Sequence, residues 1–224
     1  VAVVTTSGAG KFWKDTVVET VNLTGGSSDS TYDSGTNALD SNSTLTLFDA
    51  SGFKGRINDL LFAADQLKST VTVKGGSHAK DVVSATFAND MLVRMSGVET
   101  LGTTFTGVAA VDVSNVTGMT AVTVTSSTNP RIGTLSQLDA GVTVSLTTND
   151  VDDGVTIIRS DASLTDNVQN LTLLANIAGE NVLFDMANVE TLNVKMGAGS
   201  SDTDLVLTNF DMDTAGQTNA VVVT

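Results

Sequence analysis

Apolar and polar residues alternate in one short segment that recurs along the chain. It reads GVETLG at Gly97–Gly102, with copies at Val18–Leu23 and Val189–Val194 and a fainter one at Val168–Leu173. A period of two residues is typical of a β-strand, whose side chains point alternately to opposite faces. A strand motif that returns within one chain predicts stacked units, none of which can bury its apolar face alone.

Further short apolar segments predict strands along most of the chain. Asn, Asp, Gly and Ser fill the gaps between them, as in turns. The predicted strands centre on Ala2–Thr5, Val17–Leu23, Leu45–Phe53, Val71–Val73, Met91–Met95, Val98–Leu101, Val111–Val113, Val122–Val124, Val142–Leu146, Val155–Ile158, Leu171–Leu174, Leu183–Phe184, Leu192–Val194, Leu205–Leu207 and Val221–Val223.

Residues 25–68 fit the pattern less well, and we expect an irregular insertion there. Residues 25–35 are polar and have no apolar periodicity. Residues 56–68 fit either a short helix or a strand around Leu60–Phe62 followed by a corner. No linker divides the chain, so we expect one continuous segment over residues 1–224, excerpted from a longer protein.

Short strands at this spacing fit a β-sandwich, a barrel or a solenoid. The recurring motif favours an all-β parallel β-helix or β-solenoid with short rungs and irregular polar loops, with the β-sandwich as the alternative. The end rungs of such a stack expose strand edges, so we expect them to meet neighbouring domains or subunits.

Composition restricts the chemistry. The chain has no Cys and a single His, His78, which argues against thiolate catalysis, Cys-based metal sites and His-rich metal sites. We interpret His78 as a turn residue. Trp13, the only Trp, is interpreted as a cap over the first rungs or as an anchor for a partner subunit.

The net charge is −14, from 25 acidic and 11 basic residues. Such a chain repels nucleic acid and anionic lipid and attracts divalent cations. No run of 18 apolar residues is present, so we expect no membrane insertion. Little Lys, much Asp and Thr and no Cys indicate an extracellular protein.

Three features together resemble the bacterial surface-layer (S-layer) proteins of type I secretion, within the wider repeats-in-toxin (RTX) group. The first is the Val-Glu-Thr-Leu strand at Gly97–Leu101 and Asn188–Leu192. The second is Leu47–Phe53 followed by Val71–Gly76, and the third is Val116–Val124. The resemblance implies a calcium-bound β-solenoid that tiles into a two-dimensional lattice over the outer membrane. RTX adhesins share these features.

The RTX calcium hallmark is the nonapeptide Gly-Gly-x-Gly-x-Asp-x-apolar-x. Residues Gly75–Val82 keep the leading glycines and an Asp, but His78 and Lys80 stand where Gly and Asp belong. Residues Gly197–Leu205 are another eroded copy. We therefore expect isolated calcium sites rather than a regular stack of them.

Acidic turns are the candidate calcium sites, because calcium takes several oxygen ligands from carboxylates and carbonyls. Asp and Asn are also common in turns for conformational reasons. The candidate ligands are Asp29, Asp33, Asp81, Asn149, Asp150, Asp152, Asp153, Asp202, Asp204, Asp211 and Asp213.

The repeated acids Glu19, Glu99 and Glu190 occupy equivalent positions in separate motif copies. Hydrolysis by paired carboxylates needs two acids about 5 to 10 Å apart, whereas equivalent positions in separate repeats suggest a structural or surface ladder. We therefore predict no catalytic residues and no enzyme; a β-helix polysaccharide lyase or hydrolase is the least favoured class.

The predicted function is structural: a self-assembling S-layer segment at the cell surface whose lattice formation is aided by calcium. Its partners would be further copies of itself, with an outer-membrane glycan bound through the missing flanks. The alternative is an RTX-type adhesin stalk or ligand-binding module.

Overall fold

The computed structural model describes residues 2–4, 18–34, 44–126, 132–146, 154–160, 168–173, 183–187, 189, 191–196 and 220–223. Within these ranges the chain is all-β, with parallel strands stacked in two sheets and no helix. Successive strands alternate between the two sheets, except that the first two strands share the first sheet and the last two share the second. The fold is a β-solenoid, which confirms the fold class predicted from the sequence.

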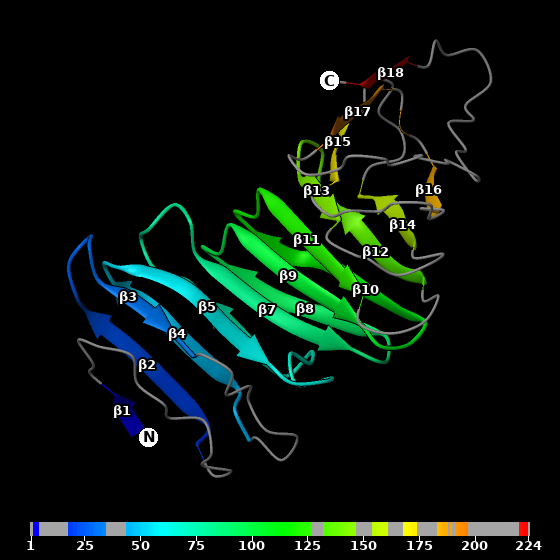
Figure 1. Ribbon diagram of the computed structural model, residues 1–224. Helices are drawn as coiled ribbons and strands as arrows, with labels where there is room; N and C mark the ends of the chain where they lie inside the picture. Colours follow the sequence, from blue (N-terminus) through cyan, green and yellow to red (C-terminus); the bar gives the residue numbers. More distant parts are fainter. Residues whose placement is uncertain are drawn as a thin grey trace. The chain divides into compact units, whose positions relative to one another are not determined.

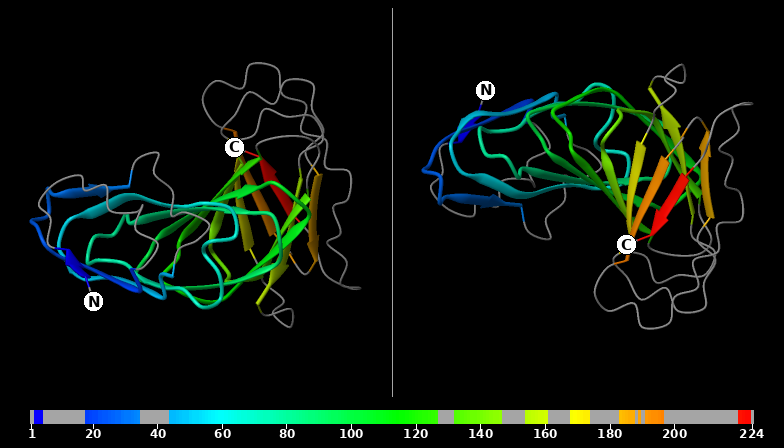
Figure 2. Two further views of the ribbon diagram at one scale, coloured as in Figure 1. Left: turned by 90° about the horizontal axis from the view of Figure 1, so that it is seen from below. Right: turned by 90° about the horizontal axis from the view of Figure 1, so that it is seen from above.

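Figure 1 labels most of the strands along the chain, and Figure 2 shows them from below and from above. The first sheet contains β1 (Ala2–Val4), β2 (Thr20–Gly25), β4 (Leu47–Phe53), β6 (Thr72–Lys74), β8 (Met91–Ser96), β10 (Ala109–Thr117), β12 (Ile132–Leu138), β14 (Gly154–Arg159) and β16 (Leu183–Ala187). The second sheet contains β3 (Thr31–Asp33), β5 (Arg56–Phe62), β7 (Val82–Phe87), β9 (Thr100–Phe105), β11 (Ala121–Ser126), β13 (Thr143–Leu146), β15 (Val168–Leu173), β17 (Thr191–Met196) and β18 (Ala220–Val223).

The chain divides into two compact units. Unit 1 comprises Val1–Thr86, Met91–Gly102 and Asn115–Met119, and unit 2 comprises Phe87–Asp90, Thr103–Ser114 and Thr120–Thr224. In unit 1 the strand orders are β1-β2-β4-β6-β8 and β3-β5-β7. In unit 2 they are β10-β12-β14-β16 and β9-β11-β13-β15-β17-β18, except that Thr100–Gly102 of β9 and Asn115–Thr117 of β10 belong to unit 1.

Buried columns form the core of each unit, because every second residue of a strand points inward and parallel strands stack in register. In unit 1, Val21, Phe48, Val73 and Met95 are in-register partners on successive strands, and all are buried. Unit 2 has the equivalent buried column Val122, Val144, Leu171 and Val194. These columns bury the apolar half of the alternation that the sequence shows.

Successive turns of the solenoid differ in length, and the difference lies in the connections between the strands. Thr20 pairs with Leu47, Leu47 with Thr72, and Thr72 with Arg94, so that 27, 25 and 22 residues separate equivalent positions. The strand columns therefore keep their register while the connections between them vary.

Residues 56–68 form a strand followed by a corner and not a helix. Arg56–Phe62 form β5, and the chain then turns at Asp65, whose φ is 57°. The apolar spacing that also fits a helix arises because a bulge in β5 shifts the alternation by one residue.

The sequence did not predict three strands. Strand β3 contains one buried apolar residue, Tyr32, inside a polar stretch. Strand β12 is interrupted at Gln137, whose φ is 61° and where the register shifts. Strand β7 alternates regularly but directly follows the eroded calcium motif, which indicated a turn. The strand predicted at Leu205–Leu207 lies outside the described residues.

The register of the last two motif copies also differs from the sequence alignment. The motif aligns Val168 with Val189, but in the structure Val168 pairs with Thr191 and Asn170 with Asn193. A shift of two residues keeps the same side chains inward, so both alignments satisfy the alternation. The structure gains the pairing in which Asn193 Nδ2 donates to Asn170 Oδ1 at 3.0 Å.

Candidate functional site

A bulge in β5 turns two consecutive polar residues, Asn58 and Asp59, away from the core. The bulge arises because Tyr32 pairs with Ile57 while Asp33 pairs with Asp59, which leaves Asn58 as the extra residue. Two carboxylates, those of Asp33 and Asp59, thus lie opposite each other on neighbouring strands of unit 1. Asn58 Nδ2 donates to Asp33 Oδ2 at 2.9 Å.

The electrostatics of this acidic pair are unfavourable to full ionisation. Burial raises the pKa of Asp59, a hydrogen bond from Ser84 opposes the rise, and the charge of Asp33 adds to it. Asp59 Oδ1 is buried and has no hydrogen-bond partner. The pair is the one place in the described residues where a sequence-predicted calcium ligand, Asp33, gains a second carboxylate in register.

A second acidic group lies at the corner of unit 1 that leads into β7. Asp81 is fully buried, and its two oxygens accept backbone hydrogen bonds from separate segments. Oδ1 accepts from the N–H of Ile57 at 2.8 Å, and Oδ2 accepts from the N–H of Gly76 at 2.7 Å. One carboxylate therefore ties the turn before β7 to the start of β5.

Glu99 repeats this linkage one turn further on. Its Oε2 accepts from the N–H of Asp81 at 2.9 Å, and its own N–H donates to the Asp81 carbonyl at 3.2 Å. Burial raises the pKa of Asp81, the two backbone hydrogen bonds oppose the rise, and the charge of Glu99 adds to it. The Glu of the recurring motif thus joins neighbouring turns through the backbone.

The expected ladder of Glu19, Glu99 and Glu190 is not formed. Glu19 precedes β2 in the first sheet, whereas Glu99 precedes β9 in the second, so the two cannot stack on one another. Glu190 lies outside the described residues. The motif marks the start of a strand, but the strand can belong to either sheet.

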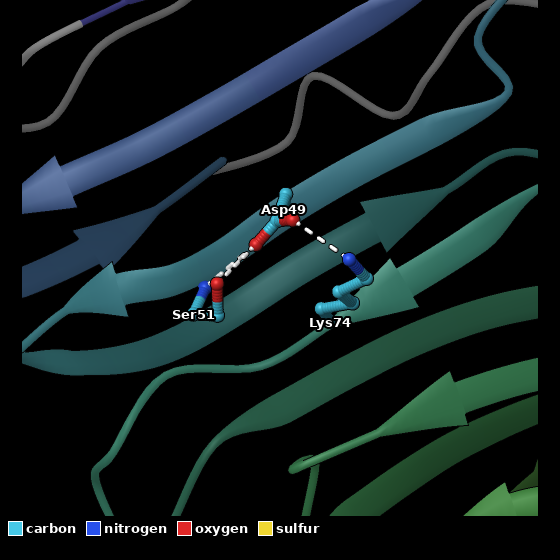
Figure 3. Close-up of polar contacts among 3 residues, drawn as sticks. All are labelled: Asp49, Ser51 and Lys74. Atoms are coloured by element: carbon cyan, nitrogen blue, oxygen red, sulfur yellow. Dashed lines mark hydrogen bonds and ion pairs between the residues drawn. The ribbon is translucent and has the colours of Figure 1, made fainter.

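A third acidic group lies on the outer face of the first sheet in unit 1 (Figure 3). Asp49 Oδ1 accepts from the Ser51 hydroxyl at 2.6 Å and from the Ser51 N–H at 3.0 Å, while Asp49 Oδ2 forms an ion pair with Lys74 Nζ at 3.0 Å. The hydrogen bonds from Ser51, together with Lys74, lower the pKa of Asp49.

The Asp-x-Ser arrangement recurs in unit 2. Asp112 Oδ1 accepts from the Ser114 N–H at 2.8 Å. In both β4 and β10 the Ser begins a pair of consecutive exposed residues, at a point where the alternation changes phase. The sequence pattern apolar-Asp-apolar-Ser-(Gly or Asn)-apolar, shared by Phe48–Phe53 and Val111–Val116, is the signal that could have predicted both.

The predicted calcium ligands therefore have different surroundings. Asp29 is exposed in the turn before β3, Asp33 is half-buried beside Asp59, and Asp81 is buried with both oxygens bound by the backbone. The structure joins Asp33 to Asp59, a residue that sequence reasoning missed, because the pairing depends on the register of two strands. The other predicted ligands lie outside the described residues: Asn149, Asp150, Asp152, Asp153, Asp202, Asp204, Asp211 and Asp213.

Calcium takes six to eight oxygen ligands. Across the described ranges, no three His, Asp or Glu side chains gather as a metal ion would require. Asp33 and Asp59 could supply part of a calcium shell, with further oxygens from water or a partner. Calcium binding thus stays a prediction. The described residues also include no helix long and apolar enough to cross a membrane.

Comparison of the chain with protein-family models, with curated proteins and with solved structures finds no match.

Proposed function

We propose that this chain is a structural segment of an extracellular protein that assembles with copies of itself into an S-layer at the cell surface. Calcium aids the assembly by bridging acidic surfaces. The chain is a scaffold and not an enzyme.

The observation that carries the proposal is the use the chain makes of its acids. Asp81 and Glu99 bind backbone N–H groups of adjacent turns, and Asp49 and Asp112 bind the serines two residues on. A catalytic centre instead converges its acids and bases on one cleft. Here the acids are distributed along the solenoid and bind groups of the chain itself, as expected of a structural protein.

The proposed role of calcium is based on the net negative charge of the chain. A net charge of −14 makes copies of the chain repel one another. A divalent cation between two carboxylate surfaces removes that repulsion, because a bound ion is the largest local charge at its site. The half-buried Asp33–Asp59 pair brings two carboxylates into register, so it is the described place where such an ion fits best.

Negative-stain electron microscopy of the purified protein tests the proposal. Samples are compared in calcium, in magnesium at the same concentration, and in chelator. We expect ordered sheets in calcium that dissolve on chelation, with magnesium less effective because it demands a tighter, octahedral shell.

Dispersed particles under all three conditions would overturn self-assembly as the function. Glycan-array binding by the dispersed protein would then favour the adhesin alternative. Ordered sheets that persist in chelator would leave the structural role standing but remove calcium from it.

A further inference from the structure

Charge is distributed unevenly between the two units. Unit 1 contains ten acidic and eight basic residues, a net charge of −2, whereas unit 2 contains fifteen acidic and three basic residues, a net charge of −12. The basic side chains of this acidic protein are therefore concentrated in one unit. A surface of unit 1 that gathers them would attract unit 2 of another copy.

Such a surface lies at the corner between the first and second sheets of unit 1. We call it the basic corner and define it as Lys54, Arg56 and Lys80. Lys54 lies in the turn between β4 and β5, and Lys80 lies in the turn between β6 and β7; both are exposed. Arg56 Nε–H donates to the Lys80 carbonyl at 3.0 Å, which holds the two turns together.

Two of the acids at this corner bind backbone N–H groups. Asp81 is buried, and its oxygens accept the N–H groups of Ile57 and Gly76. Glu99 accepts the N–H of Asp81. Asp29, in the turn before β3, is the exposed acid of the neighbouring turn. Two exposed lysines and one half-buried arginine thus lie at a corner where Asp29 is exposed, Glu99 is half-buried and Asp81 is buried.

Building on the self-assembly proposed above, we propose that the basic corner of one copy binds the acidic unit 2 of a second copy. A second copy is favoured over another anionic partner because the chain itself supplies a unit of charge −12. The two contacting surfaces are different, so the contact is heterologous and can repeat without closing. Open-ended growth is what a lattice requires.

The test measures self-association of the full 224-residue chain by sedimentation velocity in calcium, over a series of NaCl concentrations. The variant Lys54→Glu/Lys80→Glu reverses the exposed charges of the basic corner and leaves Arg56 in place. The control Lys68→Glu/Arg94→Glu makes the same change in net charge at other sites of unit 1 and leaves unit 2 unchanged. Circular dichroism checks that both variants fold.

We expect the corner variant to associate about tenfold or more weakly than the wild type, because each exposed ion pair contributes modestly and repulsion replaces attraction. The control should associate as the wild type does. Association of the wild type should weaken as NaCl rises and shortens the screening length.

A mixing experiment identifies the contact as heterologous. The corner variant still offers its own acidic unit 2, but it cannot accept a further copy. Added to growing wild-type assemblies in small amounts, it should cap them and shorten them, whereas the control variant should be incorporated without effect.

Equal association of the wild type and both variants, or equal weakening of both variants, would overturn the basic-corner contact while ordered sheets would leave the proposed function standing. Failure of the wild type to associate at all would overturn both. Salt-sensitive binding of the corner to an anionic polysaccharide, with self-association unchanged in the corner variant, would replace the second copy by that partner.

Discussion

The carboxylates of Asp81 and Glu99 connect backbone segments of neighbouring turns. Asp81 accepts one N–H from its own turn and one from the preceding turn, and Glu99 continues the linkage upward. Hydrogen bonds to an ionised acceptor are stronger than neutral ones. The corner therefore retains a carboxyl group in a buried position, because backbone N–H groups of successive turns bind to it.

Asp59 differs, because its carboxylate is repelled by the carboxylate of Asp33 on the neighbouring strand. Folding raises the pKa of Asp59, so the folded chain holds this proton at pH values at which the unfolded chain has lost it. The ionised carboxylate therefore lowers the stability of the fold, and this loss is complete above the folded pKa. The loss fades as the pH falls through that value toward the ordinary value of 3.8. Asp81 has the same sign, whereas the lowered pKa of Asp49 gives a contribution that is lost as the pH falls.

The substitution Asp59→Asn should raise the free energy of unfolding at neutral pH by about 0.2–1 kcal/mol, because like charges on opposed strands destabilise a sheet. It should also flatten the stability gain that the wild type obtains from Asp59 on acidification. Urea denaturation at several pH values measures both effects. Asp29→Asn is the control, and a loss of stability in Asp59→Asn at neutral pH would contradict the interpretation.

At the scale of single elements, glycines at the corners allow adjacent turns to approach closely. A Cβ on Gly75 would collide with the carbonyl oxygen of Gly97 in the next turn. Gly75 also donates its N–H to the Ser96 carbonyl at 2.8 Å, so neither turn can move away freely. This contact explains the leading glycine of Gly75–Val82 without calcium.

Gly75→Ala should destabilise unit 1 by about 2 kcal/mol or more, in the range of substitutions that force a backbone clash. Gly141→Ala is the matched control: its φ is 82°, but nothing lies within 4 Å of the added Cβ. The control should lose only about 1–2 kcal/mol, the strain of a left-handed conformation. Thermal and urea unfolding compare the two, and equal losses would count against the close approach of the turns.

The sequence predicts elements well where alternation is uninterrupted and poorly where a bulge intervenes. The alternation of Val142–Leu146 contains the whole of β13. The extra residue Asn58 gave β5 an apolar spacing that also fitted a helix. The register shift at Gln137 interrupts the alternation of β12, so the sequence did not predict that strand. The partnership of Asp33 with Asp59 depends on strand register, which a pattern of period two leaves open.

At the scale of the whole molecule, the net charge of −14 opposes compaction of the chain. Asp49 forms an ion pair with Lys74, but acids outnumber bases by 25 to 11, so direct pairing cannot neutralise most of the charge. Screening by salt and binding of cations remain as the two ways to relieve it.

Raising NaCl from about 0.01 M to 0.1 M shortens the screening length from about 30 Å to 10 Å. We expect the melting temperature to rise by about 2–4 °C, which corresponds to roughly 1 kcal/mol for a chain of this size. At fixed ionic strength, millimolar calcium should add a further rise through preferential binding to the folded chain. Differential scanning calorimetry measures both effects, and a fall with NaCl would exclude self-repulsion as a destabilising factor.

The fold class followed from the sequence because recurrence of a strand motif requires stacking. The placement of the motif copies did not follow, since Glu19 and Glu99 precede strands of different sheets. The sequence treats all copies as equivalent, whereas a coil with two strands per turn offers two equivalent starting points.

The unequal spacing of the turns has a consequence for how such a chain can change. Equivalent positions are separated by 27, 25 and 22 residues in successive turns of unit 1, yet the strand columns stay in register. Insertions and deletions can therefore accumulate in the connections between strands without disturbing the core. The connections can change in length during evolution while the strand columns stay the same. The same freedom makes the corners natural places to graft foreign peptides, which would be displayed about 4.8 Å apart from one turn to the next.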